Sequence, residues 1–223
     1  MRGHLSPYYA PEFYAQALAR GRHRDIVGGR WNETGEAQMA LLTGLGLQPH
    51  HHLLDIGCGS LRLGCKAVPF LDPGHYWGTD MSAALMQRGY ETELADKTRL
   101  PPAQLIEDAA FAFPGVPDRI DHAIAFAVFT HLPLSYLAGA FTRLRARFPR
   151  LEWFCFTVFI APDAATASGP LRQRDGVVTH PDRAPYHLLA RDVAQAADEA
   201  GFALAPLPAV LPRGQAAFVA RPR

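Results

Sequence analysis

The stretch that decides the fold reads LLDIGCGSLRLG and spans residues 53–64. Its apolar start predicts a buried strand ending in an acid, Asp55, and its glycines predict a tight turn into a helix. Glycine adopts positive φ angles without a Cβ clash and lets a backbone approach a ligand closely. We expect Ser60 to cap the helix, whose exposed N–H groups favour a negative or polar ligand group. The alternative is a tight turn that binds no ligand.

The glycine spacing differs from that of dinucleotide-binding proteins. In the G-x-G-x-x-G fingerprint a third glycine packs the helix against the strand, but here Gly64 follows Gly59 by five residues. Two more short strands are expected to end near acids, Asp80 and Asp108, and a long apolar strand covers residues 120–128. Because ligands of open parallel sheets bind outside the carboxyl ends of the strands, three acids there suit a ligand rich in hydroxyls and amines and without phosphates.

Strand and helix patterns alternate along the chain without an internal repeat, which predicts an α/β fold with a mostly parallel sheet. We expect a helical lid over residues 1–46 and a core over residues 47–223, with a loop-rich insertion at 161–184. The expected helices cover residues 11–19, 34–45, 60–70, 82–95, 133–147 and 189–200. The expected strands cover residues 52–56, 75–80, 103–107, 120–128, 152–160, 202–207 and 215–220, the last two forming a hairpin.

Composition excludes several classes of protein. The 223 residues suit one domain with a sizeable core, and the net charge of +1 carries no electrostatic footprint for nucleic acid or an anionic membrane. No signal peptide or membrane-spanning run is evident, so we expect a cytoplasmic protein. The three cysteines lack metal or disulfide spacing, and the run at residues 50–52 is interpreted as a solvated histidine turn. No metal site is expected.

The chain resembles the class I S-adenosylmethionine (SAM)-dependent methyltransferases of the bacterial small-molecule type. The resemblance extends over residues 26–202 and rests on the glycine motif, the turn Gly78-Thr79-Asp80 and the segment Phe129-Thr130-His131-Leu132-Pro133. It implies one Rossmann-like, seven-stranded, mostly parallel sheet with an antiparallel last strand, helices on both faces and an N-terminal helical lid. It also implies SAM as the cofactor.

The resemblance assigns cofactor contacts residue by residue. Asp55 would hold the methionine amino group through water, and Gly57 and Gly59 would let the backbone pass under the sulfonium. Asp80 would accept hydrogen bonds from both ribose hydroxyls. The remaining contacts would be Met81 against the adenine, Asp108 and Ala109 at the adenine edge, and Phe126 and Ala127 near the transferable methyl.

Candidates for the methyl acceptor's site follow from position. His131 comes directly after the fourth strand and is the leading candidate for a general base; a role in fixing the turn before Pro133 is the alternative. Trp31, with the tyrosines at 8, 9 and 14, could close over the cofactor or simply pack a helix. Phe129, Tyr136 and Tyr186 are the remaining candidates for substrate contact. Arg30 or Arg62 could pair with the methionine carboxylate, since a guanidinium matches its geometry, or serve as structural charges.

The function expected is methyl transfer from SAM to an oxygen or nitrogen atom of a small organic molecule, for example in secondary metabolism. Two alternatives remain open at this stage: a SAM-binding protein without catalysis, and an oxidoreductase with a nucleotide cofactor. The missing third glycine weighs against the oxidoreductase. Expected partners are limited to the small-molecule acceptor, with no nucleic acid and no membrane, and the protein is expected to be a monomer or a homodimer.

Overall fold

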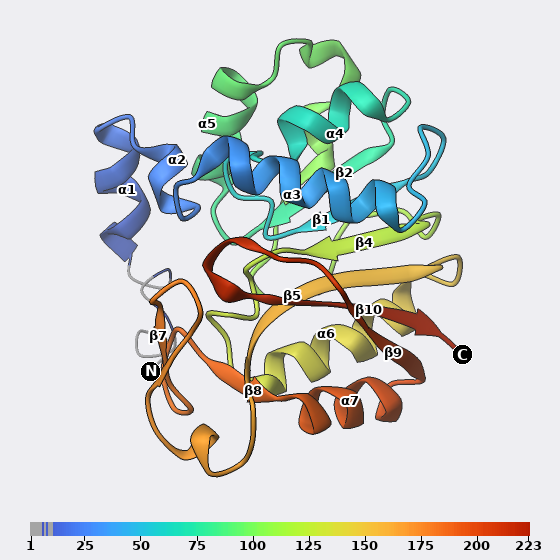
Figure 1. Cartoon of the computed structure of the whole chain (residues 1–223). Coiled ribbons are helices and arrows are strands. Elements are labelled where there is room, and N and C mark those ends of the chain that lie inside the picture. Colours follow the sequence, from blue (N-terminus) through green and yellow to red (C-terminus); the bar gives the residue numbers. More distant parts are fainter. Residues whose placement is uncertain (1–5, 7, 9–10) are drawn as a thin grey trace. The chain divides into compact units, whose positions relative to one another are not determined.

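The computed structural model describes Ser6, Tyr8 and residues 11–223 of the chain (Figure 1). These residues divide into two compact units. The N-terminal unit is Pro11–Ile124, and the C-terminal unit is Ala125–Arg223 together with Ser6 and Tyr8. The boundary falls in the strand that precedes the segment with His131.

The N-terminal unit is built on four parallel strands in the order β3-β2-β1-β4. These are β1 (Leu53–Ile56), β2 (Tyr76–Asp80), β3 (Leu105–Glu107) and β4 (His122–Ala125). Every residue of β1 and β4 is buried, as short apolar strands of a parallel sheet require. Asp55 pairs with Gly78 on one side and Ile124 on the other. Parallel pairing therefore brings the glycine turn and Asp80 to the same edge of these strands.

The helices of this unit surround that edge. The α-helices are α1 (Pro11–Ala19), α2 (His23–Ile26), α3 (Trp31–Gly44), α4 (Gly64–Phe70) and α5 (Ala83–Glu93), and two short 3₁₀ helices, η2 (Lys97–Arg99) and η3 (Pro102–Gln104), lead into β3. Helix α5 starts at Ser82, whose hydroxyl accepts a hydrogen bond from the N–H of Leu85 (3.2 Å). Both α1 and α2 pack against α5, and α3 packs on α4. The N-terminal helices thus belong to the unit that carries the glycine turn.

The C-terminal unit is mainly antiparallel. Its strands are β5 (Trp153–Ala161), β8 (His187–Leu189), β9 (Phe202–Leu207) and β10 (Ala216–Pro222), in the order β5-β10-β9, with β8 parallel to the end of β5. Helices α6 (Leu134–Arg147) and α7 (Ala190–Glu199) lie side by side on one face of these strands (Figure 1). Phenylalanine rings from strands and helices meet in its core: Phe141, Phe154, Phe156, Phe202 and Phe218.

The insertion between β5 and β8 contains a 3₁₀ helix, η4 (Thr166–Ser168), and a short hairpin of β6 (Leu171–Arg172) and β7 (Val178–Thr179). Buried His187 holds it in place: its ring bonds the Thr179 hydroxyl (2.9 Å) and the carbonyl of Ala167 (3.1 Å). A further 3₁₀ helix, η5 (Pro212–Gly214), comes before β10. The insertion is therefore an ordered part of the C-terminal unit.

The expected fold class is confirmed. The strands are mostly parallel with antiparallel last strands, and helices pack around them, as in a Rossmann-like fold. Helix α1 has the expected bounds, and the two C-terminal strands form the expected hairpin. The short strand β8 is one more than the seven expected, because residues 187–189 extend along β5 before α7 begins.

Two local expectations were wrong. Ser60 does not cap a helix: α4 begins at Gly64, and the Ser60 hydroxyl donates to the carbonyl of His23 (3.1 Å). The fourth strand ends at Ala125 rather than at residue 128, because Ala127 has a φ of +60°, which no strand residue adopts. Both errors come from contacts between residues far apart in sequence.

Candidate functional site

The glycine turn connects β1 to α4 and has a left-handed backbone at three positions. Gly57, Gly59 and Leu61 have φ angles of +72°, +56° and +63°. The N–H groups of Gly57 and Cys58 both donate to the carbonyl of Thr79 at the end of β2 (2.7 and 3.0 Å). A Cβ atom on Gly59 would lie 2.5 Å from Cγ1 of Val27, so no larger residue fits there. The turn needs glycine at this position for two reasons, backbone conformation and space.

Asp80, at the end of β2, is bonded to this turn. Its carboxylate accepts hydrogen bonds from the N–H of Gly59 (2.9 Å) and the N–H of Ser82 (3.0 Å). Burial raises its pKa to about 6, although these backbone bonds act in the opposite direction. The carboxylate is thus held beside the glycine turn and retains lone pairs for further donors.

Asp55 is buried behind the turn, with 2% of its surface exposed. The hydroxyl of Tyr76 donates to its carboxylate (2.6 Å), and burial raises the pKa of Asp55 to about 7. Gly64 makes room for this pair, because a Cβ atom there would lie 3.1 Å from the Tyr76 hydroxyl oxygen. The late third glycine of the motif therefore has a structural reason. Sequence reasoning missed Tyr76, whose signal was a polar aromatic residue at the start of a strand that ends in an acid.

Asp108 shapes the loop after β3. Its backbone N–H donates to the carbonyl of Asp80 (2.8 Å), and its carboxylate accepts from the N–H groups of Ala110 and Phe113 (both 2.8 Å). These bonds hold a turn in which Phe111 and Phe113 have positive φ angles. Ala109 is exposed in this turn, and Met81 beside Asp80 is half-buried. Seven of the expected cofactor contacts, all but Phe126 and Ala127, thus lie at the ends of adjacent strands of one unit.

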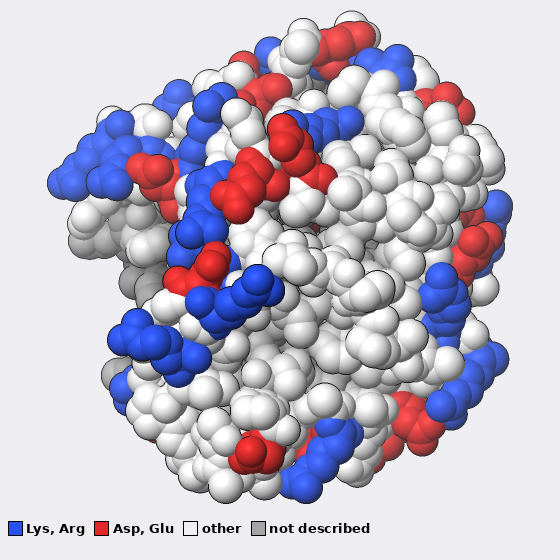
Figure 2. Space-filling view, in the orientation of Figure 1, with Lys and Arg blue, Asp and Glu red and all other residues white. Residues whose placement is uncertain are grey.

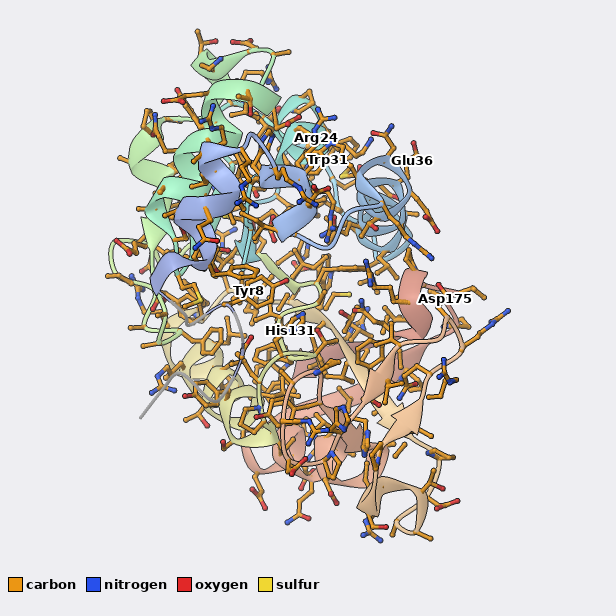
Figure 3. All side chains as sticks on the ribbon, turned by 90° about the vertical axis from the view of Figure 1, so that its left-hand side faces the viewer. Tyr8, Arg24, Trp31, Glu36, His131 and Asp175 are labelled. Carbon is orange, nitrogen blue, oxygen red and sulfur yellow. The ribbon has the colours of Figure 1, made fainter. Side chains whose placement is uncertain are left out.

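A segment of the N-terminal helices is attached to the same edge, which sequence reasoning missed. Glu93, at the end of α5, binds the guanidinium of Arg24 through both oxygens (2.8 Å each) and the ring of His23 (2.6 Å). The Arg24 guanidinium lies over the ring of Trp31, 4.9 Å from its centroid (Figure 3). With the bond from Ser60 to the carbonyl of His23, these contacts join residues 23–31 to the glycine turn. We call this set of contacts the Glu93 latch.

The two candidate arginines differ in their surroundings. Arg62 is buried, and its guanidinium donates to the carbonyl of Val27 (2.5 Å) and the amide oxygen of Gln38 (3.3 Å). It fastens the segment before α3 to the glycine turn, which is the structural role considered for it. Arg30 is exposed, and its guanidinium lies 3.7 Å from the Glu33 carboxylate.

The C-terminal unit carries the residues expected at the acceptor. The ring of Tyr8 packs edge-on against the ring of His131, with centroids 4.8 Å apart (Figure 3). Burial, and secondarily the charge of Arg213, lowers the pKa of His131 to about 4. The imidazole is therefore neutral at neutral pH and has a lone pair available. Tyr9, which was considered with Tyr8, lies outside the described residues, and Tyr14 packs edge-on against Phe13 (5.5 Å).

Tyr186 lies next to the His131 segment. Its backbone N–H donates to the carbonyl of Thr130 (2.7 Å). Its pKa is raised, first by burial and then by the charges of Asp182 and Tyr136. His131 and Tyr186 are thus brought together as a group, and Tyr136 lies in the first turn of α6. Phe126 is 5% exposed where β4 ends.

Phe129 serves the core rather than this group. It is 1% exposed, and its ring packs at right angles to those of Phe154 and Phe156, with centroids 6.4 Å away in each case. This packing accounts for a phenylalanine there.

The described residues show mixed charges on one face, no metal-binding cluster and no membrane-spanning helix. On the face shown in Figure 2, basic and acidic side chains are interleaved. Within the described part of the chain, no group of three or more His, Cys, Asp and Glu side chains is arranged to hold a metal ion. None of the helices built from those residues combines the length and the apolar character needed to cross a membrane.

No protein-family model matches the chain, but solved structures do. Magnesium protoporphyrin IX methyltransferase (ChlM) from Synechocystis PCC 6803, solved with bound SAM, is 16% identical with a TM-score of 0.61, over 94% of each chain. A TehB-like SAM-dependent methyltransferase from Corynebacterium glutamicum is 15% identical with a TM-score of 0.60, over 96% of this chain and 100% of its own. The glycopeptide N-methyltransferase MtfA is 17% identical with a TM-score of 0.60, over 86% and 90%. At these identities the likeness establishes the fold.

Proposed function

We propose that the protein is a SAM-dependent methyltransferase that methylates an oxygen or nitrogen atom of a small organic molecule. The observation that carries the proposal is the pair of carboxylates, Asp55 and Asp80, held at a glycine turn where parallel strands end. Both have raised pKa values, about 7 and about 6, because the fold buries them. These two carboxylates favour a ligand that supplies positive charge and hydrogen-bond donors.

SAM has these properties and carries no phosphate, unlike a dinucleotide. SAM carries a sulfonium, an amino group and two ribose hydroxyls, whereas the pyrophosphate of a dinucleotide would face two buried acids. Proteins with this fold have been crystallised with SAM or its product S-adenosylhomocysteine (SAH). The chemistry of the donor set and the fold therefore favour the same cofactor.

The cofactor contacts of the proposal are those of the N-terminal unit. Asp80 would accept the ribose hydroxyls, and Asp55 would attract the amino group through water. The backbone at Gly57 and Gly59 would lie against the methionine portion. Met81 would pack on the adenine, with Asp108 and Ala109 at the adenine edge.

Bound SAM supplies an already activated methyl group. The protein's own contribution is to align the acceptor and to exclude water, effects that can lower a barrier by roughly 7–11 kcal/mol in favourable systems. When the acceptor loses a proton, a nitrogen of the neutral His131 ring would accept it. Tyr136 and Tyr186 would contact the acceptor from the same unit. A base of this kind typically contributes a factor of about 10²–10⁴.

We infer that a small metabolite is the only ligand besides SAM. The interleaved surface charges in Figure 2 and the net charge of +1 support this, because nucleic acids and anionic membranes select basic surfaces. We expect a cytoplasmic monomer or homodimer, and a setting such as secondary metabolism. A SAM-binding protein without catalysis is the second candidate, since every cofactor contact could persist without turnover.

Equilibrium binding followed by a transfer assay separates these possibilities. The purified protein is titrated with SAM and, separately, with NAD, and then incubated with methyl-labelled SAM and a panel of small hydroxyl- and amine-bearing metabolites. Methylation of a panel member together with SAM binding supports the proposal. SAM binding with no transfer to any member supports a binding protein, and preference for NAD contradicts the proposal.

A further inference from the structure

Ala127 has an unfavourable backbone conformation at the end of β4. Its φ angle is +60°, in the left-handed region that a residue with a Cβ atom rarely occupies. It lies two residues beyond the last strand residue, Ala125, and opens the turn that leads to His131. Strain of this kind persists only where surrounding contacts impose it, and it concentrates at functional sites.

Two buried side chains impose it here. The N–H of Ala127 donates to the hydroxyl oxygen of Thr157 (2.7 Å), and that hydroxyl donates to the side-chain oxygen of Gln215 (2.6 Å). Thr157 is fully buried and Gln215 is 7% exposed, so both bonds are shielded from water. On its other side, the Ala127 carbonyl accepts the hydroxyl of Thr130 (2.9 Å). Both polar backbone groups of Ala127 are therefore bound.

The position of Thr157 within β5 makes its hydroxyl informative. The strand reads WFCFTVFIA, and Thr157 is its one hydroxyl-bearing residue. Valine would fill the same volume without a polar atom to satisfy, so packing alone does not call for threonine. We call the two hydrogen bonds from Ala127 to Thr157 and from Thr157 to Gln215 the relay. The strand register explains it, because Thr157 pairs with Ala217 of β10 and so brings Gln215, just before that strand, within reach. The hydroxyl has one evident use, which is to connect Ala127 to Gln215.

The relay holds the turn that carries His131, the candidate general base. Beyond Ala127, the N–H of His131 donates to the carbonyl of Val128 (3.0 Å), and the carbonyl of Thr130 accepts the N–H of Tyr186 (2.7 Å). The direction in which residues 127–131 leave β4 is therefore set at Ala127, and the later bonds keep it. A change at Ala127 would displace the His131 ring and Tyr186 together.

We propose that Thr157 and Gln215 are positioning residues for methyl transfer, which hold the turn at residues 127–131 in its reactive arrangement without touching either substrate. The inference rests on the proposed function. It predicts that loss of the relay lowers the rate of transfer and leaves SAM affinity nearly unchanged, because the polar contacts proposed for the cofactor lie within residues 55–109.

Substitutions of Thr157 test this. Thr157→Val keeps the shape and removes the relay, and we expect its turnover to fall at least tenfold while the SAM dissociation constant stays within twofold. Thr157→Ser restores the hydroxyl and should stay within about threefold of wild type. Thr142→Val, at an exposed threonine of α6 in the same unit, is the matched control and should behave as wild type. Turnover of Thr157→Val within twofold of wild type would overturn the proposal, and so would equal losses in the valine and serine variants.

A second-site variant isolates the strain. Glycine adopts positive φ readily, so the double variant Ala127→Gly with Thr157→Val should recover at least a third of the lost turnover. No recovery would mean that the conformation of Ala127 is not what the relay maintains.

Hydrogen exchange provides a readout without activity. Peptides covering residues 125–132 should exchange at least fivefold faster in Thr157→Val and return to the wild-type rate in Thr157→Ser. Unchanged exchange in the valine variant contradicts the relay itself. If exchange behaves as expected but wild type binds no SAM, then the relay stands and the proposed function fails.

Discussion

The glycine turn and the turn at residues 127–131 solve one problem in different ways. Each follows a strand, and each needs a left-handed backbone to place groups beyond the strand end. The first turn uses Gly57 and Gly59, for which that backbone costs little. The second uses Ala127, whose conformation depends on a buried threonine and glutamine. A left-handed turn encoded by glycines can be predicted from a sequence, whereas one imposed by distant side chains cannot.

The two turns also differ in the space available for a side chain. Gly59 is crowded by Val27, so the turn with glycine cannot accept a side chain. Ala127 already has a Cβ atom and would lose strain if that atom were removed. We therefore expect substitutions in the glycine turn to act through steric overlap. Substitutions around the turn at residues 127–131 should act through the loss of hydrogen bonds.

The largest effect is expected for Gly59→Ala. Strain at positive φ and overlap with Val27 should together lower the free energy of unfolding by about 2–4 kcal/mol. Gly46→Ala is the matched control, since Gly46 has a φ of +92° but nothing within 4 Å of its would-be Cβ; it should lose only about 1 kcal/mol. Denaturant unfolding measures both. Equal losses would show that crowding by Val27 does not matter, and a gain on adding Val27→Ala to Gly59→Ala would confirm that it does.

The next effect concerns the other turn. His131→Ala should lower turnover by about 10²-fold, or about 2.7 kcal/mol in activation free energy, because the acceptor's proton loses its neutral base. The dissociation constant of SAM should stay within twofold, and His50→Ala, at an exposed histidine, should leave both unchanged. Normal turnover in His131→Ala would assign the ring to the structure of the turn and leave catalysis to alignment.

The Glu93 latch should give a smaller effect. Glu93→Gln weakens a bidentate bond to Arg24 and the bond to His23, and because Arg24 is half exposed we expect a loss of about 1–2 kcal/mol. Release of SAH should accelerate, and amides of residues 20–31 should exchange faster. Asp25→Asn removes an exposed pair with Arg22 and is the control. If Glu93→Gln and Asp25→Asn release SAH at the same rate, the latch does not retain the cofactor.

A change of pH should alter the free energy of unfolding in opposite directions through the acids at the glycine turn and through His131. Asp55 and Asp80 have raised pKa values, so the folded state holds more protons than the unfolded state between about pH 4 and 7. Their contribution to stability is present at low pH and declines as pH rises through that window. His131, with a lowered pKa of about 4, contributes stability that is gained as pH rises to about 6.5 and lost below.

Melting curves of the cofactor-free protein from pH 4 to 8 measure this balance. Asp80→Asn should remove up to about 3 kcal/mol of the decline with rising pH, and His131→Ala should remove part of the opposing gain. Parallel pH profiles for wild type and both variants would contradict the burial ascribed to these groups.

The sequence predicted the fold class, the helix at residues 11–19 and the acids at the strand ends, because glycine spacing and apolar runs are local signals. It could not predict that Ser60 bonds the carbonyl of His23 instead of capping a helix, since that bond needs the N-terminal segment to be in place. The same holds for Tyr76 behind Asp55 and for Ala127 beneath Thr157. Each of these partners is more than 20 residues away in the chain, where periodicity carries no information.

Calorimetric titration with SAM tests the central claim most directly. Wild type should bind SAM at one site per chain, and Asp80→Ala should bind at least tenfold more weakly, because two ribose hydroxyls lose a buried acceptor worth about 1–3 kcal/mol. Asp118→Ala, at an exposed acid of the same unit, should bind as wild type does. Absence of SAM binding to the intact protein, or equal binding by wild type and Asp80→Ala, would contradict the account.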